Sequence, residues 1–353
     1  MLKIIRSLFT LALFMIILGG LKFITMDPFW KTKKNELNVF VYSGVFDLDM
    51  IDRFEVETGI KVNLHFFTTN EELLTKLQFS KGKGEGIDLL FPCDFGCKIL
   101  SDRGFLGTID KSRLNFLDRI YPCLLNQTFD PENDYSIPFV WEAYGIGYNP
   151  AMVEKDKLSL DDLFDERYQK VTTPDIVELI DLAAYHLYGD ITSINEDQEK
   201  EVTKLLIEQK KSMEAYADFR AKDLLCSNAA DIALLKTSFI TGLKERSDLI
   251  KFTLPSDAIF LSIQCAVISN ETKNHDSIYK FLNFLYEPKN LALTTDQFPS
   301  YPACPDAFEH TSAHHKEFIE TIDEIKDRKE DIRFFLNITE VKRMQKIFID
   351  AKA

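Results

Sequence analysis

The first part of the chain alternates between short apolar runs and segments whose apolar residues recur at helical spacing. Residues 37–42 (LNVFVY) form a compact apolar run, and residues 62–67 and 87–92 (IDLLFP) form two more. Between these runs, residues 47–59 show helical spacing and end at a glycine, and residues 70–79 open on an asparagine that can cap a helix. This order of strand, helix, strand, helix and strand predicts a mostly parallel sheet covered by helices on both faces.

Two longer apolar runs follow. Residues 138–148 come directly after a polar turn rich in Asp, Asn and Pro and are broken only by Glu142, and residues 259–268 form a second run of similar character. Strand and helix patterns return between the two runs, which indicates a second sheet-and-helix unit. We interpret the runs as two strands that cross between two lobes, an arrangement that makes a hinge and a cleft suited to ligand capture. We expect lobe one to comprise residues 37–140 and 262–300, and lobe two residues 141–261 and 301–351.

The first 24 residues differ from the rest of the chain. Lys3 and Arg6 precede an apolar run from Leu8 to Leu21, which is the order found in a secretory signal peptide. The run is short for a membrane span of ~20 residues. No clear cleavage site follows it, so an uncleaved anchor in the inner membrane is an alternative, and a buried N-terminal helix is another. The first two interpretations place the rest of the chain in the periplasm.

The composition is that of a folded, acidic protein. Its 353 residues suffice for two domains, and its 45% apolar and 28% charged residues are typical of a globular chain. The formal net charge of −14 disfavours nucleic acid as a partner. No phosphate-binding, nucleophile-elbow or zinc-protease motif occurs, so no motif indicates an enzyme or a cofactor. His310, His314 and His315 could chelate a metal, but their polar surroundings favour solvated histidines. Of the six cysteines, Cys93 and Cys97 are four residues apart and could form a disulfide or remain buried thiols.

Several segments resemble the periplasmic spermidine/putrescine-binding proteins of ABC importers. These segments are ETGIKV (57–62), IDLLFP (87–92), IDKSRL (109–114), FDPENDYSIPFVWEAYGIGYN (129–149), KFLNFLYEP (280–288) and SYPA (300–303). The resemblance extends from about Leu37 to the C-terminus, and NDYSIPF is its strongest single match. It implies an α/β, two-lobed periplasmic binding protein fold. In that fold each lobe is a mostly parallel sheet flanked by helices, and two crossover strands join the lobes.

The resemblance also implies how a polyamine is held. Each ammonium group needs a carboxylate, and the methylene segments need apolar or aromatic walls. The segment PDIVE is similar to a family segment with two ligand carboxylates three residues apart, which fall here on Asp175 and Glu178, and Tyr301 matches a pocket tyrosine. On a helix, this spacing places both acids on one face. The same two residues fit a capping box at a helix N-terminus, and they can fill both roles.

Other positions depart from the family's pattern. The aromatic loop after the first strand is shortened and retains Ser43 and Phe46 as candidates, and Gln264 replaces an aspartate that holds a terminal ammonium. Asp94 or Glu142 could supply the missing charge. The full set of expected binding residues is Ser43, Phe46, Cys93, Asp94, Phe95, Asp175, Glu178, Gln264 and Tyr301.

The resemblance therefore implies a monomeric extracytoplasmic protein that closes over spermidine or putrescine. The ligand would be delivered to the membrane permease and ATPase of an ABC importer, without a cofactor and without nucleic acid. Two rival interpretations stay open. Lys236 would repel a polycation if it faced the site, so the ligand could be another small solute. Alternatively, the chain could be an envelope interaction protein whose pocket is degenerate.

Overall fold

The structure is a computed structural model that describes residues 35–68, 70–80, 86–155, 157–172, 176–217, 220–239, 250–312, 319–335 and 339–352. The candidate signal peptide and Asp175 lie outside the described residues. Within these ranges, no helix combines the length and the apolar character needed to cross a bilayer.

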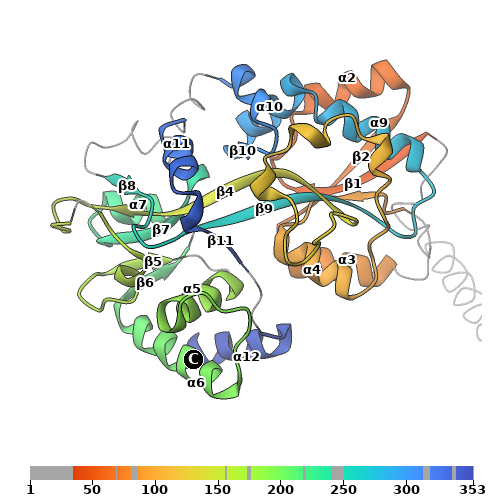
Figure 1. The fold of residues 1–353 in the computed structure, drawn as a ribbon. Helices are drawn as coiled ribbons and strands as arrows, with labels where there is room; N and C mark the ends of the chain where they lie inside the picture. The colour runs from red at the N-terminus through yellow and green to blue at the C-terminus, as the bar shows by residue number, and fades with distance from the viewer. Residues whose placement is uncertain are drawn as a thin grey trace, which may run out of the picture.

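Strands from both halves of the chain form one continuous sheet (Figure 1). The strands are β1 (Glu36–Tyr42), β2 (Lys61–Phe67), β3 (Leu89–Leu90), β4 (Ser136–Tyr148), β5 (Lys170–Thr172), β6 (Met213–Tyr216), β7 (Ile232–Lys236), β8 (Lys251–Thr253), β9 (Ile259–Ile268), β10 (Tyr301–Pro302) and β11 (Ile332–Phe334). The main path runs β2-β1-β3-β9-β4-β7-β5-β6, and β8, β10 and β11 pair with β4 or β9 beside it. The strands at each end of this path are parallel, whereas β4 and β9 are antiparallel to each other and to their main-path neighbours.

The first lobe is built on the parallel strands β2, β1 and β3. Its helices are α2 (Leu48–Thr58), α3 (Asn70–Ser80), α4 (Asp94–Asp102), α9 (His275–Leu285) and α10 (Pro288–Gln297). Helices α2, α9 and α10 lie on one side of the sheet and α3 and α4 on the other (Figure 1). Helix α2 begins and ends where its sequence predicts: the Asp47 carboxylate accepts the N–H of Met50 at 2.8 Å, and Gly59 ends the helix in the left-handed conformation at φ 68°.

The second lobe is built on the parallel strands β5, β6 and β7. Its helices are α5 (Ile176–Tyr188), α6 (Glu196–Gln209), α7 (Ala221–Cys226) and α12 (Val341–Lys352), and α11 (Ile319–Asp327) lies above the crossing between the lobes in Figure 1. Strand β8 packs closely over β4 at Gly145. A Cβ atom at Gly145 would lie 2.0 Å from the ring of Phe252, so a larger residue at this position would displace that ring.

The two long strands β4 and β9 run between the lobes, as the two apolar runs predict (Figure 1). All thirteen residues of β4 are buried, which explains why the run follows so abruptly on a polar turn. The register shifts between Pro138 and Val140, because proline has no N–H to donate and is tolerated at such irregularities. The carbonyl of Phe139 instead accepts the N–H of Ala303, which ties the segment after β10 to β4.

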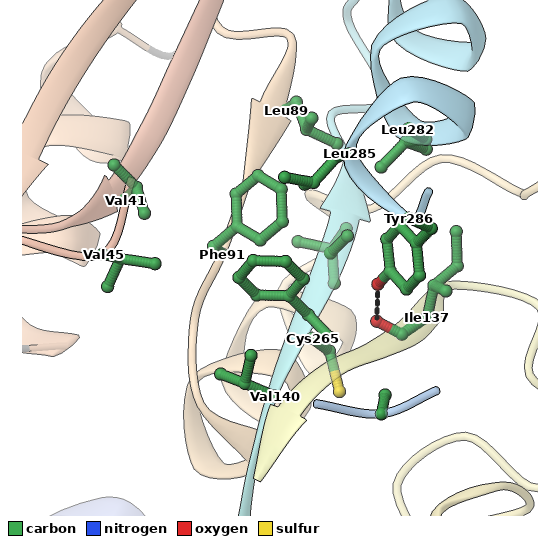
Figure 2. Packing of buried hydrophobic residues seen from close by; sticks show 14 of the residues in the cluster. Val41, Val45, Leu89, Phe91, Ile137, Val140, Cys265, Leu282, Leu285 and Tyr286 are labelled. Atoms are coloured by element: carbon green, nitrogen blue, oxygen red, sulfur yellow. Dashed lines mark hydrogen bonds between the residues drawn. The ribbon is translucent and has the colours of Figure 1, made fainter. Parts of the chain in front are cut away.

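The apolar cores follow the two lobes. Figure 2 shows Leu89 and Phe91 from the sheet packed near Leu285 and Tyr286 at the end of α9. The Tyr286 hydroxyl donates to the carbonyl oxygens of Pro138, at 2.8 Å, and Ile137, at 3.4 Å, so the entry of β4 is bonded to this helix end. Separate clusters in the second lobe lie between α5, α6 and α12 and around α7.

The lobe boundaries expected from the sequence stay a proposal. Packing favours one change to them: Tyr301, Ile322 and Ile325 belong to the same apolar cluster as the first lobe, although residues 301–351 are expected in the second. Helix α12, by contrast, packs with α5 and α6 of the second lobe.

All six cysteines are free thiols in the structure. Cys97 lies one helical turn after Cys93 and near the thiol of Cys265 on β9. Burial raises the pKa of the Cys97 thiol well above its ordinary value, so the thiol stays protonated and packs as a small apolar group.

Asp130 organises the turn that leads into β4. Its buried carboxylate accepts the backbone N–H groups of Asp134, Tyr135 and Ser136 at 2.8–3.0 Å and the Ser136 hydroxyl at 2.7 Å. We expect Asp130→Ala to lower the free energy of unfolding by about 2–4 kcal/mol, since several buried donors lose a charged acceptor. Urea denaturation measures this. Glu132→Ala removes an exposed carboxylate from the same turn and should change stability by less than about 0.5 kcal/mol; equal effects of the two variants would contradict the role of Asp130.

Candidate functional site

Strand register brings a set of polar side chains onto one face of the crossover strands. Residues opposite each other in an antiparallel pair share a face, and so do residues two apart on one strand. Glu142 is opposite Ser262, Tyr144 is opposite Lys236, and Gln264 is opposite both Val140 and Cys93. We call this set the crossover face: Cys93, Val140, Glu142, Tyr144, Lys236, Ser262 and Gln264. It runs from the end of β3 in the first lobe to the end of β7 in the second.

Lys236 lies at the second-lobe end of the crossover face. Its Nζ atom is 3.4 Å from Oε1 of Glu178, which is contributed by the first turn of α5, and 5.3 Å from the ring centroid of Tyr144. Glu178 is 8% exposed, so this charge is largely removed from water. A buried carboxylate requires such a partner, and an aromatic face adds attraction for the cation. The lysine therefore faces the junction between the lobes.

Asp94 lies at the first-lobe end, in the first turn of α4. The carboxylate accepts the N–H of Phe95 at 2.8 Å and that of Ile263 at 3.4 Å, on the edge of β9 just beyond the point where β3 ends. Asp94 is 4% exposed, and burial raises the pKa of its carboxyl to about 6. The two backbone donors, the positive charge of Lys236 and a hydrogen bond with Cys93 offset only part of this rise.

Glu142 is the third acid of the site and the single charged residue in β4. It is 7% exposed, and its place two residues before Tyr144 makes it a diagonal neighbour of Lys236 across the strand pair. The three carboxyl groups thus come from the first lobe, the crossover and the second lobe. Buried carboxyl groups attract positive charge, so the described part of this site suits a cationic ligand.

Gln264 adds a neutral acceptor to this set. Its Oε1 atom is buried and accepts no hydrogen bond from the described part of the chain. A buried carbonyl oxygen without a donor is costly, and an N–H group of a ligand would remove that cost.

The structure places Cys93, Asp94, Glu178 and Gln264 at the junction of the lobes and Phe95 beside them. Their binding role stays a prediction. The Phe95 ring extends from α4 and packs against the second-lobe cluster that contains Leu179 and Ile180. The first lobe therefore contacts the second directly beside Asp94.

Other expected residues lie elsewhere. Phe46 is buried in the first-lobe core, with edge-to-face contacts to Phe91 at 5.1 Å and Phe139 at 5.9 Å, and Ser43 is exposed in the turn after β1. Their proposed binding roles have no support from this packing. Asp175 lies outside the described residues, so its pairing with Glu178 stays a prediction.

Tyr301 lies at the edge of the site. Its buried ring packs on Trp141 at 4.6 Å, and its hydroxyl lies near Thr237, the residue after Lys236, and near Thr321. Burial, and to a smaller degree the charge of Glu142, raise the pKa of this hydroxyl. A binding role for Tyr301 stays a prediction.

Sequence reasoning missed Tyr144 and left the direction of Lys236 open. One signal was present: Glu142 and Tyr144 are two apart in an otherwise apolar strand, which predicts a shared face. The approach of Lys236 to Glu178 left no such signal, because 57 residues lie between the two in the chain.

A small pocket elsewhere in the second lobe does not compete with this site. Its volume is about 30 Å³, and its lining includes Asp181, Asp190 and Arg333. This holds about two water molecules and is too small for an organic solute.

Comparison with known proteins places the chain among transport proteins. A family model described as bacterial extracellular solute-binding protein matches residues 49–321. The chain is similar to the spermidine/putrescine-binding periplasmic protein of Escherichia coli (strain K12), with 27% identity over 260 residues that cover 72% of this chain and 73% of the relative. It is also 27% identical to the putrescine/cadaverine-binding protein of Pseudomonas aeruginosa over 285 residues, which cover 75% of this chain and 78% of the relative.

A solved structure bears on the fold. The spermidine/putrescine ABC transporter substrate-binding protein of Streptococcus pneumoniae matches with a TM-score of 0.75 at 23% identity, covering 90% of this chain and 99% of that chain. This likeness confirms the two-lobed periplasmic binding protein fold.

The raised pKa of Asp94 predicts a pH-dependent stability. The unfolded carboxyl titrates near its ordinary pKa of 3.8, and the folded one at about 6. The folded state therefore holds the proton more tightly, and its advantage is full below about pH 4 and lost as pH rises through about 6. The shift corresponds to about 3 kcal/mol.

In the variant Asp94→Asn the side chain does not ionise, so it stays neutral at every pH of the experiment. We expect the free energy of unfolding of the variant, relative to wild type, to rise by up to about 3 kcal/mol between about pH 4 and pH 7. Urea denaturation at a series of pH values measures it. The matched control is Asp102→Asn, at the exposed end of the same helix, where the carboxylate pairs with Lys98 in solvent. A difference for Asp94→Asn that stays constant with pH, or that is matched by the control, would contradict a raised pKa.

Proposed function

This chain belongs to the bacterial extracellular solute-binding protein family, and on that premise we propose that it captures a polyamine between its lobes in the periplasm. It then delivers the polyamine to the permease and ATPase of an ABC importer. The family consists of solute-binding transport proteins and is not an enzyme family. The proposal accordingly includes no catalytic step and no cofactor.

The observation that carries the proposal is the set of buried carboxyl groups at the junction of the lobes. Asp94, Glu142 and Glu178 are each less than a tenth exposed. Buried acids are costly unless positive charge accompanies them, as that of Lys236 accompanies Glu178 and Asp94. The ammonium groups of a ligand would stabilise the same acids.

The surroundings of these acids suit the remainder of a polyamine. The ring of Tyr144 already lies beneath one ammonium group, and Val140 and Cys93 give the crossover face an apolar part between its acids. Methylene groups are stabilised by such contacts, whereas a chain of hydroxyl groups would need acceptors and donors along its length.

The position of the acids also explains how the ligand would promote closure. Asp94 moves with the first lobe and Glu178 with the second, while Glu142 lies on a strand that connects them. A ligand that bonds to both lobes binds the closed arrangement more tightly than the open one and shifts the population toward it. The permease can then distinguish the loaded protein by its closed shape.

Isothermal titration calorimetry of the exported chain with putrescine, cadaverine and spermidine tests the proposal. We expect binding of at least one polyamine and none of 1,4-butanediol, which keeps the carbon chain but lacks the charges. Glu142→Gln should weaken binding by at least tenfold, about 1.4 kcal/mol, because a buried charge partner is lost.

Glu132→Gln is the control, since it removes one exposed negative charge from the turn before β4. It should leave the affinity within about twofold, because exposed charges are screened. Absence of heat with every polyamine up to millimolar concentration, together with no polyamine seen by native mass spectrometry, would refute the function.

A further inference from the structure

Phe95 joins the two lobes by an apolar contact that the proposed function does not require. Its side chain extends from the first turn of α4, in the first lobe, and packs against the second-lobe cluster between α5, α6 and α12. Two buried members of that cluster, Leu179 and Ile180, directly follow Glu178 on α5. The contact therefore lies beside the charged groups of the site, but it depends on apolar burial and not on charge.

The backbone of Phe95 is fixed to the crossover strands. Its N–H donates to the Asp94 carboxylate at 2.8 Å, and the other oxygen of that carboxylate accepts the N–H of Ile263 on β9 at 3.4 Å. The N–H of Cys265 on β9 also donates to the carbonyl of Pro92, just before α4, at 2.9 Å. The beginning of α4 is thus held against β9, and the Phe95 ring stays with the first lobe when the lobes separate.

The position of the contact decides which arrangement of the lobes it favours. Helices α4 and α5 lie on the same side of the crossover strands (Figure 1), and they carry Asp94 and Glu178 in their first turns. Lobes that rotate about β4 and β9 bring these two helices together on closing and move them apart on opening. The contact of Phe95 is therefore lost on opening, so its burial stabilises the closed arrangement.

We propose that Phe95 is a latch that holds the lobes closed, so that the closed arrangement is populated before a ligand binds. The apparent affinity of a ligand falls with the fraction of the chain that is closed, so a residue that raises this fraction tightens binding without touching the ligand. Phe95 is in this sense a positioning residue, because it brings Asp94 and Glu178 toward each other. This inference goes beyond the proposed function and does not depend on the ligand being a polyamine.

The latch differs from the role that the family resemblance implies for the same ring. An aromatic wall contacts the ligand, so its loss weakens binding and leaves the shape of the ligand-free chain unchanged. A latch contacts the second lobe, so its loss also opens the ligand-free chain. The shape of the ligand-free chain therefore distinguishes the two roles.

Small-angle X-ray scattering of the ligand-free exported chain tests the latch. We expect Phe95→Ala and Phe95→Gln to increase the radius of gyration relative to wild type, because both remove the apolar ring from the junction. Phe95→Leu keeps much of the apolar volume and should stay close to wild type. In calorimetric titration with putrescine, Phe95→Ala should weaken binding by about three- to tenfold, since a smaller fraction of the chain is closed.

The matched control is Phe66→Ala. Phe66 is a 45% exposed phenylalanine on β2, at the opposite end of the sheet path from the strands of the second lobe. This variant removes the same side chain from the first lobe at a place away from the junction. Its radius of gyration and its affinity for putrescine should match those of the wild type.

The outcomes decide the latch separately from the proposed function. A radius of gyration that is unchanged in both Phe95→Ala and Phe95→Gln would overturn the latch, and so would an equal change in the Phe66→Ala control. Weaker putrescine binding with unchanged scattering would assign Phe95 to the ligand and would also overturn it. If the wild type binds no polyamine, the proposed function fails, and scattering of the ligand-free variants still decides whether Phe95 holds the lobes closed.

Discussion

The antiparallel pairing of β4 with β9 is the constraint on which the rest of the molecule depends. These two strands hold the lobes together, and their register decides which side chains meet at the junction. Because side chains alternate with a period of two, a slip of one residue would turn Glu142 and Gln264 away from the crossover face. The turn anchored by Asp130 and the Tyr286 hydroxyl both fix the beginning of β4, and thereby protect that register.

The electrostatics of the site follow from this geometry. Burial outweighs the favourable contacts of Asp94 and brings its pKa to about 6, even with two N–H donors and a lysine nearby. The junction therefore retains unfavourable free energy that an arriving cation would relieve. Near Glu178 the same problem is solved within the chain, by Lys236 and the ring of Tyr144. This acid is thus stabilised within the folded chain.

The contact of Phe95 with the second-lobe cluster shows how closely the lobes approach beside these acids. An apolar contact at this point excludes water from the neighbouring carboxylates and strengthens each charge interaction. Under the proposed function, this contact would break when the lobes open and would form again, together with the paired charges, when a ligand is captured.

Much of the framework was determined by the sequence alone. The apolar runs of β1, β4 and β9 can be recognised from the order of residues within each run. The residues that cap α2 can be recognised in the same way, because their hydrogen bonds join groups only a few residues apart. The acids Asp94 and Glu178 were also identified as binding candidates, through the family resemblance. Short strands such as β6 and β11 were missed, because two or three paired residues acquire their conformation from distant partners.

Only the tertiary structure decided what the polar residues do. Phe46 is an aromatic residue of the kind that lines a binding pocket, yet other phenylalanine rings surround it in the core. Lysine is usually exposed at the surface, yet the approach of α5 to the end of β7 encloses Lys236 beside Glu178. Local patterns report which face of an element is buried, whereas the energy of a charge depends on which other charges the folded chain brings within a few ångströms of it, and that is fixed by packing.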